Sequence, residues 1–217
     1  MTKEFLITRP LHDEKMFYLY SFSKAIIQIA KENKKILLIN LEGERANRKE
    51  LESALNKHDK GLVYLNGHGD ERTVFGHNDM PILDKDNIKI TKNRILYALA
   101  CSSLVELGQL AVENGAQAYI GYRDEFMWVV DPSKSAAPDK DRNAAPFRKV
   151  CHALISFLVN GEQVGTAVEK TKMEYKKLIK SYGTSEDDPF GDAPAIGLAL
   201  SWDLLCLDAE GDKKAVF

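Results

Sequence analysis

The sequence predicts an α/β fold, a three-layer α/β/α sandwich in which helices cover both faces of a mostly parallel sheet of about six strands. Short apolar runs recur along the chain and alternate with segments of helical periodicity. These runs are apolar at nearly every position, which is typical of strands buried on both faces. The alternation of such strands with helices indicates a parallel sheet between two helical layers.

Length and composition indicate one ordinary globular domain, which we expect to span residues 1–217. The formal net charge of −2 gives no reason to expect nucleic-acid binding. No apolar run approaches the ~20 residues that cross a bilayer, and the first apolar run is too short for a secretory signal. The cysteines, Cys101, Cys151 and Cys206, form no paired framework, so we expect a reducing, cytoplasmic setting.

The elements can be placed by their apolar patterns. Buried strands are expected at residues 5–8, 36–41, 62–65, 95–99 and 118–121, with a sixth, edge strand at 204–207. Helices are expected at residues 13–31, 46–58, 104–114, 147–159 and 163–182. The segment between His68 and residue 95 should form a hairpin or an ordered loop over the strand ends.

Residues 127–146 carry three prolines and mixed charges, and predict a long loop. Loops of this length in a compact domain are usually functional or disordered. This one contains Lys134, Lys140 and Arg142, so a self-cleavage or regulatory segment is one expectation for it. A second polar loop is expected at residues 183–192.

Two of the expected strands each end in a reactive side chain. Residues 62–65 lead into His68-Gly69, and residues 95–99 lead into Cys101. Ligands of open parallel sheets bind beyond the carboxyl ends of the strands, and neighbouring strands lie about 5 Å apart. We therefore expect Cys101 to be a nucleophile and His68 its base. The N–H groups of Gly69 and Cys101 are the expected oxyanion hole, and no third member of a triad is identifiable.

The pairs His68-Gly69 and Ala100-Cys101 resemble those of the caspase-like cysteine peptidases, the group of caspases, gingipains, separase and CHAT domains. The similarity is closest to CHAT-type domains and covers most of the chain. Leu107-Gly108, Gly115-Ala116 and the run Tyr119 to Tyr122 follow the cysteine in a similar order. The resemblance implies cleavage of a protein or peptide by Cys101, assisted by His68, without metal or organic cofactor.

The sequence departs from the family at two positions. Caspases carry Gln two residues before the nucleophile, where this chain has Leu99, so their specificity for aspartate is not implied. Ser102-Ser103 replaces the acidic, glycine-containing continuation that is common after a CHAT cysteine.

The residue preferred before the scissile bond is left open between two charges. Asp124 and Glu125 follow the strand at residues 118–121 and could pair with a basic side chain of the substrate. Arg9 and Arg123 could instead favour an acidic one, because a buried charge must be paired. We favour a basic residue, since two adjacent carboxylates follow the strand nearest the nucleophile.

The function expected is a cytoplasmic endopeptidase that cuts a specific protein partner, because an unrestrained protease there would be toxic. A regulatory protein partner is compatible with this, and no membrane or nucleic-acid partner is expected. The resemblance suggests a microbial defence or cell-death pathway.

Two alternatives are a non-catalytic interaction module of the same fold, in which Cys101 is only a small buried side chain, and a flavodoxin- or receiver-type binding domain. The second lacks the required acidic cluster or phosphate loop. Among the remaining candidate residues, Cys151 and Cys206 are expected in the core, and the other four histidines are expected at the surface: His12, His58, His77 and His152.

Overall fold

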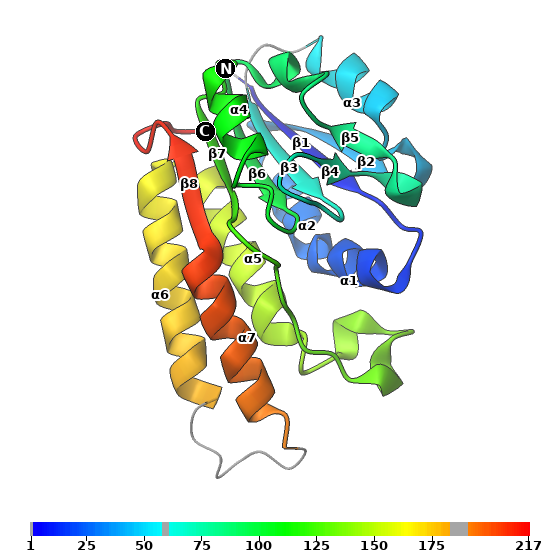
Figure 1. Cartoon of the computed structure of the whole chain (residues 1–217), viewed down its shortest axis with the longest axis vertical. Coiled ribbons are helices and arrows are strands. Elements are labelled where there is room, and N and C mark those ends of the chain that lie inside the picture. The colour runs from blue at the N-terminus through cyan, green and yellow to red at the C-terminus, as the bar shows by residue number, and fades with distance from the viewer. Residues whose placement is uncertain (1, 58–60, 183–190) are drawn as a thin grey trace.

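A computed structural model describes residues 2–57, 61–182 and 191–217, and its centre is a six-stranded sheet (Figure 1). The strands lie in the order β2-β1-β3-β6-β7-β8. Neighbouring strands are parallel except at one edge, where β8 runs antiparallel to β7. Their bounds are β1 Lys3–Arg9, β2 Ile36–Glu42, β3 Gly61–Asn66, β6 Arg94–Leu99, β7 Ala118–Tyr122 and β8 Leu207–Gly211. The predicted α/β class and the mostly parallel sheet are confirmed.

Helices cover both faces of this sheet, as Figure 1 shows. Five helices pack on one face: α1 (Glu14–Phe22), α2 (Lys24–Glu32), α5 (Ala145–Val159), α6 (Val164–Tyr182) and α7 (Ala193–Cys206). The other face carries α3 (Arg48–Leu55), α4 (Leu107–Glu113) and a hairpin of β4 (Val74–Phe75) and β5 (Pro81–Leu83). A hydrophobic core lies on each face of the sheet. Successive side chains of a strand point to opposite faces, so alternate residues of each inner strand belong to different cores.

The two central strands, β3 and β6, are joined in a fixed register. Tyr64 pairs with Tyr97, and their rings stack with centroids 4.9 Å apart and planes 4° from parallel. Both side chains are fully buried in the core under α1, α2 and α5. The paired residues continue to Asn66 and Leu99, where the regular strands end. This register fixes which residues of the two following loops lie side by side.

The single helix predicted at residues 13–31 is two helices, because the helix is interrupted at Ser23. The Ser23 hydroxyl donates to the carbonyl of Tyr20 at 2.7 Å and accepts from Arg9 Nε at 2.7 Å. Ser23 is thus both the end of α1 and the start of α2. The buried guanidinium that binds it comes from another strand, so the local apolar pattern of residues 13–31 does not reveal the break.

The prediction for the C-terminal segment is wrong in one respect. Residues 204–206 belong to α7 rather than to an edge strand, and the edge strand is β8, which begins at Leu207. The sequence of α7 is apolar almost all round, so it lacks the periodicity that identifies an amphipathic helix. Pro194 lies in the first turn of α7, a position that tolerates proline.

The two predicted irregular segments are confirmed. The chain between His68 and β6 holds the β4–β5 hairpin and short 3₁₀ turns. Residues 127–144 are irregular apart from 3₁₀ turns at Pro132–Lys134 and Pro138–Lys140. The buried carboxylate of Asp141 fastens this segment, accepting from the hydroxyl of Tyr18 on α1 at 2.7 Å. His58 and most of the loop predicted at 183–192 lie outside the described residues.

None of the described helices is long and apolar enough to span a membrane.

Candidate active site

The two reactive side chains singled out from the sequence follow neighbouring parallel strands. Asn66 of β3 pairs with Leu99 of β6, and His68 and Cys101 each lie two residues beyond that pair. Both side chains line one cleft of about 400 Å³ at the carboxyl end of the sheet. The structure therefore brings His68 and Cys101 to one surface depression, where open parallel sheets bind their ligands.

The walls of this cleft come from three parts of the chain. The start of α1 contributes charged and apolar side chains, the loops after β3 and β6 contribute His68 and Cys101, and the segment after β7 contributes two aromatic rings. Besides His68, the cleft is lined by the charged residues Glu14, Lys15 and Glu125. The aromatic lining residues include Phe126 and Trp128, whose ring centroids lie 5.6 Å apart. The cleft thus combines an apolar floor with a few charges.

Asp13 holds the imidazole of His68. Its Oδ2 lies 2.8 Å from His68 Nε2, while its Oδ1 accepts from the N–H of Met16 at 2.7 Å and caps α1. Burial alone would raise the pKa of Asp13, but the Met16 N–H, His68 and His12 outweigh it and lower the pKa. A carboxylate that accepts from Nε2 leaves Nδ1 as the nitrogen that can take a proton.

The sequence does not identify Asp13 as the partner of His68, and its only local signal is that of a helix N-cap. Asp13 precedes Met16 by three residues at the start of a helix, which indicates an N-cap. It also follows β1, which pairs with β3 in the sheet. Loops that follow neighbouring parallel strands meet at one edge, so the segment after β1 lies beside that after β3.

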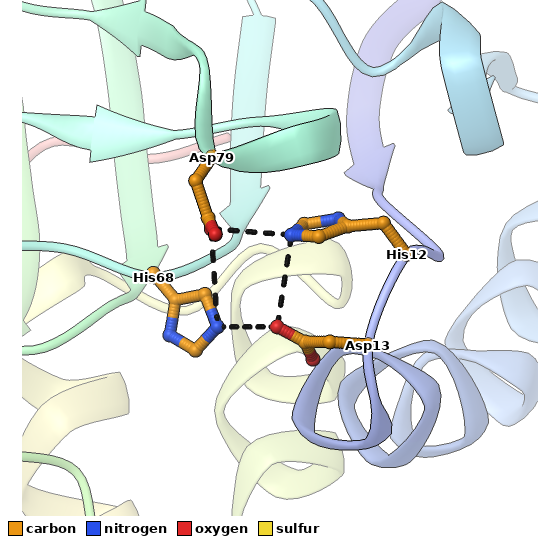
Figure 2. Close-up of side chains that lie close together, drawn as sticks. All are labelled: His12, Asp13, His68 and Asp79. Atoms are coloured by element: carbon orange, nitrogen blue, oxygen red, sulfur yellow. Dashed lines mark hydrogen bonds and ion pairs between the residues drawn. The ribbon is translucent and has the colours of Figure 1, made fainter.

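His12 and Asp79 extend the charged side of the site (Figure 2). The Nε2 of His12 lies 3.1 Å from Asp79 Oδ1 and 3.6 Å from Asp13 Oδ2. The His12 side chain is only 9% exposed, so its expected place at the surface is wrong. His77 packs its ring against that of His12, with centroids 5.2 Å apart. The site of His68 is therefore a cluster of imidazoles and carboxylates rather than an isolated histidine.

Cys101 lies in a different environment, half-buried and largely apolar. Burial raises the pKa of the Cys101 thiol, and the N–H of Phe126, which donates to the sulfur, opposes that rise only in part. Nearby Glu125 raises the pKa further. No hydrogen bond joins the thiol to His68 within the described part of the chain. Both burial and Glu125 favour the neutral thiol over the thiolate.

The loop that carries Cys101 is held by the end of the neighbouring strand. Ser102 has a φ of +53°, a left-handed conformation that costs a non-glycine residue free energy. Its N–H donates to the carbonyl of Asp124 at 3.0 Å, and the N–H of Leu104 donates to the carbonyl of Tyr122 at 3.2 Å. The backbone after β7 thus holds a strained turn directly after the cysteine.

Gly69 lies directly against the cysteine. A Cβ at this position would be 2.8 Å from both the Cβ of Ala100 and the carbonyl oxygen of Cys101, closer than side chains pack. The N–H groups of Gly69 and Cys101 donate to no acceptor within residues 2–57, 61–182 and 191–217. Two free N–H groups beside the thiol are what an oxyanion hole requires.

Helix α7, which the sequence did not reveal, holds the wall of the cleft after β7. The carboxylate of Asp203 accepts from the N–H of Met127 at 2.9 Å, and the indole of Trp202 donates to the carbonyl of Glu125 at 3.0 Å. Asp203 is fully buried, and burial raises its pKa well above the ordinary value. Its second oxygen has no partner among the described residues.

The four residues proposed from the sequence for substrate binding separate into two groups. Glu125 lines the cleft, whereas the carboxylate of Asp124 accepts from the N–H of Glu125 and is not among the lining residues. Arg9 and Arg123 lie away from the cleft. Arg9 pairs with Glu42 at 2.9 Å and stacks on Tyr20, and Arg123 pairs with Asp208 and Glu210 of β8. Cys151 and Cys206 are buried, as expected.

The comparisons with known proteins give a likeness in structure and none in sequence. No family model and no curated protein matches the sequence. The fold is similar to separase in the Saccharomyces cerevisiae separase–securin complex, with a TM-score of 0.56 and 15% identity over 97% of this chain and 12% of that one. The C11 cysteine protease iotapain of Bacteroides thetaiotaomicron matches 78% of this chain and 73% of its own, at 10% identity and a TM-score of 0.42.

The likeness to separase shows that this chain has the fold of the caspase-like peptidases. At 15% identity it shows the fold and leaves the activity to be argued from the site. The chain spans 12% of the separase chain that it matches.

Proposed function

We propose that the protein is a cysteine endopeptidase in which Cys101 is the nucleophile, His68 the general base and acid, and Asp13 the residue that orients His68. One observation carries this proposal: His68 and Cys101 follow registered neighbouring strands and line one cleft. The carboxylate 2.8 Å from His68 Nε2 supports it, because it sets the tautomer that leaves Nδ1 free to act as a base.

The reaction proceeds through an acyl-enzyme. Substrate binding brings the thiol and His68 Nδ1 together, a contact that often tightens only in the bound complex. The Cys101 proton passes to Nδ1, the thiolate attacks the scissile carbonyl, and the resulting oxyanion accepts from the N–H groups of Gly69 and Cys101. Asp13 stabilises the imidazolium, which then gives its proton to the leaving amine. Water, deprotonated by His68, hydrolyses the thioester and releases the new carboxylate.

The substrate of this proposal is a specific protein inside the cell rather than bulk protein. The separase of the comparison is a peptidase seen in complex with the protein securin. A regulatory protein partner for the present chain is proposed on that analogy. CHAT-type membership and a role in microbial defence or cell death are proposed from the sequence resemblance, and the cytoplasmic setting from the unpaired cysteines.

A basic residue before the scissile bond remains the favoured substrate feature. Of the carboxylates proposed for this role from the sequence, Glu125 lines the cleft, and Glu14 at the start of α1 is a second lining acid. The two arginines that would favour an acidic residue are paired elsewhere. Lys15 is the one lining residue, within the described part of the chain, that argues for an acidic substrate.

One observation favours a second candidate, the non-catalytic interaction module. Burial raises the pKa of the Cys101 thiol, and the thiol has no hydrogen bond to His68 in this conformation. A module that only binds a partner would keep its cysteine in this neutral form. It would bind the same partner whether or not residue 101 carried sulfur.

A peptide panel separates the two candidates. Fluorogenic peptides with Arg, Lys, Asp or Leu before the scissile bond are incubated with the wild type and with Cys101→Ala. We expect cleavage after Arg or Lys and a fall in kcat/KM of at least about 10³-fold in the variant, because the nucleophile is lost. Cys206→Ala, which removes another buried thiol, should keep its activity. Equal turnover by the wild type and Cys101→Ala would reject the peptidase, and a preference for Asp would reverse the assigned specificity.

A further inference from the structure

Four metal-ligating side chains from three segments converge beside the cleft (Figure 2). His12 and Asp13 come from the segment between β1 and α1, His68 follows β3, and Asp79 lies between β4 and β5. Each offers one ligand atom, and the four atoms lie within 4.8 Å of one another. Only the tertiary fold brings these two imidazoles and two carboxylates together, so no sequence motif predicts the cluster.

The separations in this cluster are close to those of a four-coordinate metal site. Asp13 Oδ2 lies 2.8 Å from His68 Nε2 and 3.6 Å from His12 Nε2, while Asp79 Oδ1 lies 3.1 Å from His12 Nε2 and 4.0 Å from His68 Nε2. In a tetrahedral zinc site with bonds of about 2.0–2.2 Å, the ligand atoms are about 3.3–3.5 Å apart. Asp79 is 62% exposed, so a small rotation of its side chain would even out its own two distances to the imidazoles.

Charge and burial also suit a divalent cation. Within the described residues, Asp13 and Asp79 form ion pairs only with the two imidazoles, and no lysine or arginine neutralises them. Two carboxylates would balance the two charges of the metal, and neutral imidazoles would supply lone pairs. The side chain of His12 is 9% exposed, and its polar contacts all run through Nε2, which faces the cluster. Its Nδ1 is buried without a partner among the described residues.

We propose that His12, Asp13, His68 and Asp79 form a zinc site whose occupancy inhibits the peptidase. Two nitrogen and two oxygen ligands favour Zn²⁺, whereas Mg²⁺ and Ca²⁺ take six or more oxygen ligands. The metal takes the lone pair of His68 Nε2, so the single proton of the neutral imidazole moves from Nε2 to Nδ1 by exchange with solvent. With Nε2 bound to zinc and Nδ1 protonated, neither nitrogen can accept the proton of Cys101. The inhibitory effect rests on the proposed function, whereas the binding of zinc does not.

Binding is tested by calorimetry with Zn²⁺ on the full chain carrying Cys101→Ala, freed of metal with EDTA. This background removes the half-buried thiol of Cys101 as a ligand. We expect one bound equivalent, with the affinity reduced about tenfold or more by adding Asp79→Asn or His12→Gln, as for perturbed metal sites. Asp86→Asn, which removes an exposed carboxylate from the same chain segment, should bind like the parent. No binding by the parent, or unchanged binding by the Asp79 and His12 variants, would overturn the site.

Inhibition is tested on the chain that retains Cys101. With EDTA present we expect peptidase activity, and with rising free Zn²⁺ we expect it to fall with a midpoint that matches the calorimetric affinity. Asp79→Asn should be active in EDTA and require about tenfold more Zn²⁺ for inhibition. An unchanged midpoint in that variant would contradict the inhibitory role. A chain inactive even in EDTA would refute the proposed peptidase, while calorimetry would still decide the zinc site.

Discussion

The two sides of the cleft differ in how they treat charge. The His68 side is polar: its imidazole is bound by the carboxylate of Asp13, whose pKa is lowered. The Cys101 side is apolar, and burial raises the pKa of the thiol. One side is organised before substrate arrives, whereas the other holds its reactive atom in an uncharged form.

For the proposed peptidase, this difference would explain a low reactivity of Cys101 in the absence of substrate. A thiol with a raised pKa is a poor nucleophile, because the thiolate is the reactive form. An imidazole already oriented by a carboxylate needs only to approach the thiol to deprotonate it. In the proposed mechanism, catalysis is therefore controlled by the approach of the two sides, and substitutions at three positions separate their contributions.

The largest of these effects is expected at Asp13, which has two roles that can be separated. Asp13→Asn keeps a good N-cap for α1 and removes the charge beside His68. We expect kcat to fall by about 10²-fold or more, with little change in stability. Asp13→Ala should lose a similar amount of activity and also about 1 kcal/mol of stability. Assays in EDTA exclude effects of zinc, and urea unfolding measures the stability.

A matching activity in Asp13→Asn and the wild type would remove Asp13 from the mechanism. A large loss of stability in Asp13→Asn would indicate that the carboxylate mainly supports the fold.

A smaller loss is expected at Gly69, on the boundary between the two sides. In Gly69→Ala the new Cβ meets the backbone of Cys101 at 2.8 Å, so the loop or the glycine must move. We expect kcat to fall by about 10-fold to 10²-fold, because the oxyanion donors are displaced. Gly197→Ala on α7 is the control: its Cβ meets nothing within 4 Å, and it should gain about 0.5–1 kcal/mol of stability. Equal activity of the two variants would remove Gly69 from the oxyanion hole.

The smallest effect is expected at Asp203, whose carboxylate binds the backbone of Met127 on the apolar side of the cleft. Its pKa is raised in the folded state, so its contribution to stability is fully present below the unfolded pKa of about 4 and is lost as pH rises toward the folded pKa. Asp203→Asn keeps the acceptor for Met127 and removes this loss. We expect its urea midpoint to exceed that of the wild type by an amount that grows from pH 5 to pH 8. A constant difference across that range would show that Asp203 does not titrate as a buried acid.

The sequence predicts the two sides of the cleft unequally, for a physical reason. His68, Gly69 and Cys101 could be found because each follows a short apolar strand. The register of the two parallel strands then places them side by side. Asp13 and His12 follow β1, but their approach to His68 depends on the sheet order, with β1 next to β3, which local patterns do not encode.

Other parts of the site were hidden for different reasons. Helix α7 is apolar all round, so its role behind Glu125 and Met127 could not be seen from periodicity. Arg9 and Arg123 looked available for substrate because their carboxylate partners lie on other strands: Glu42 on β2 and Asp208 on β8. Long-range ion pairs of this kind become visible only when the sheet is assembled.

The central claim is that His68 activates Cys101, and the rate of covalent labelling tests it most directly. The chain is incubated in EDTA with a peptidyl chloromethyl ketone that carries Arg next to the reactive carbon, and intact mass follows the adduct. The account predicts one adduct in the wild type, none in Cys101→Ala, and labelling slowed by about 10²-fold or more in His68→Ala. Labelling at the same rate in His68→Ala, or no labelling of the wild type, would contradict it.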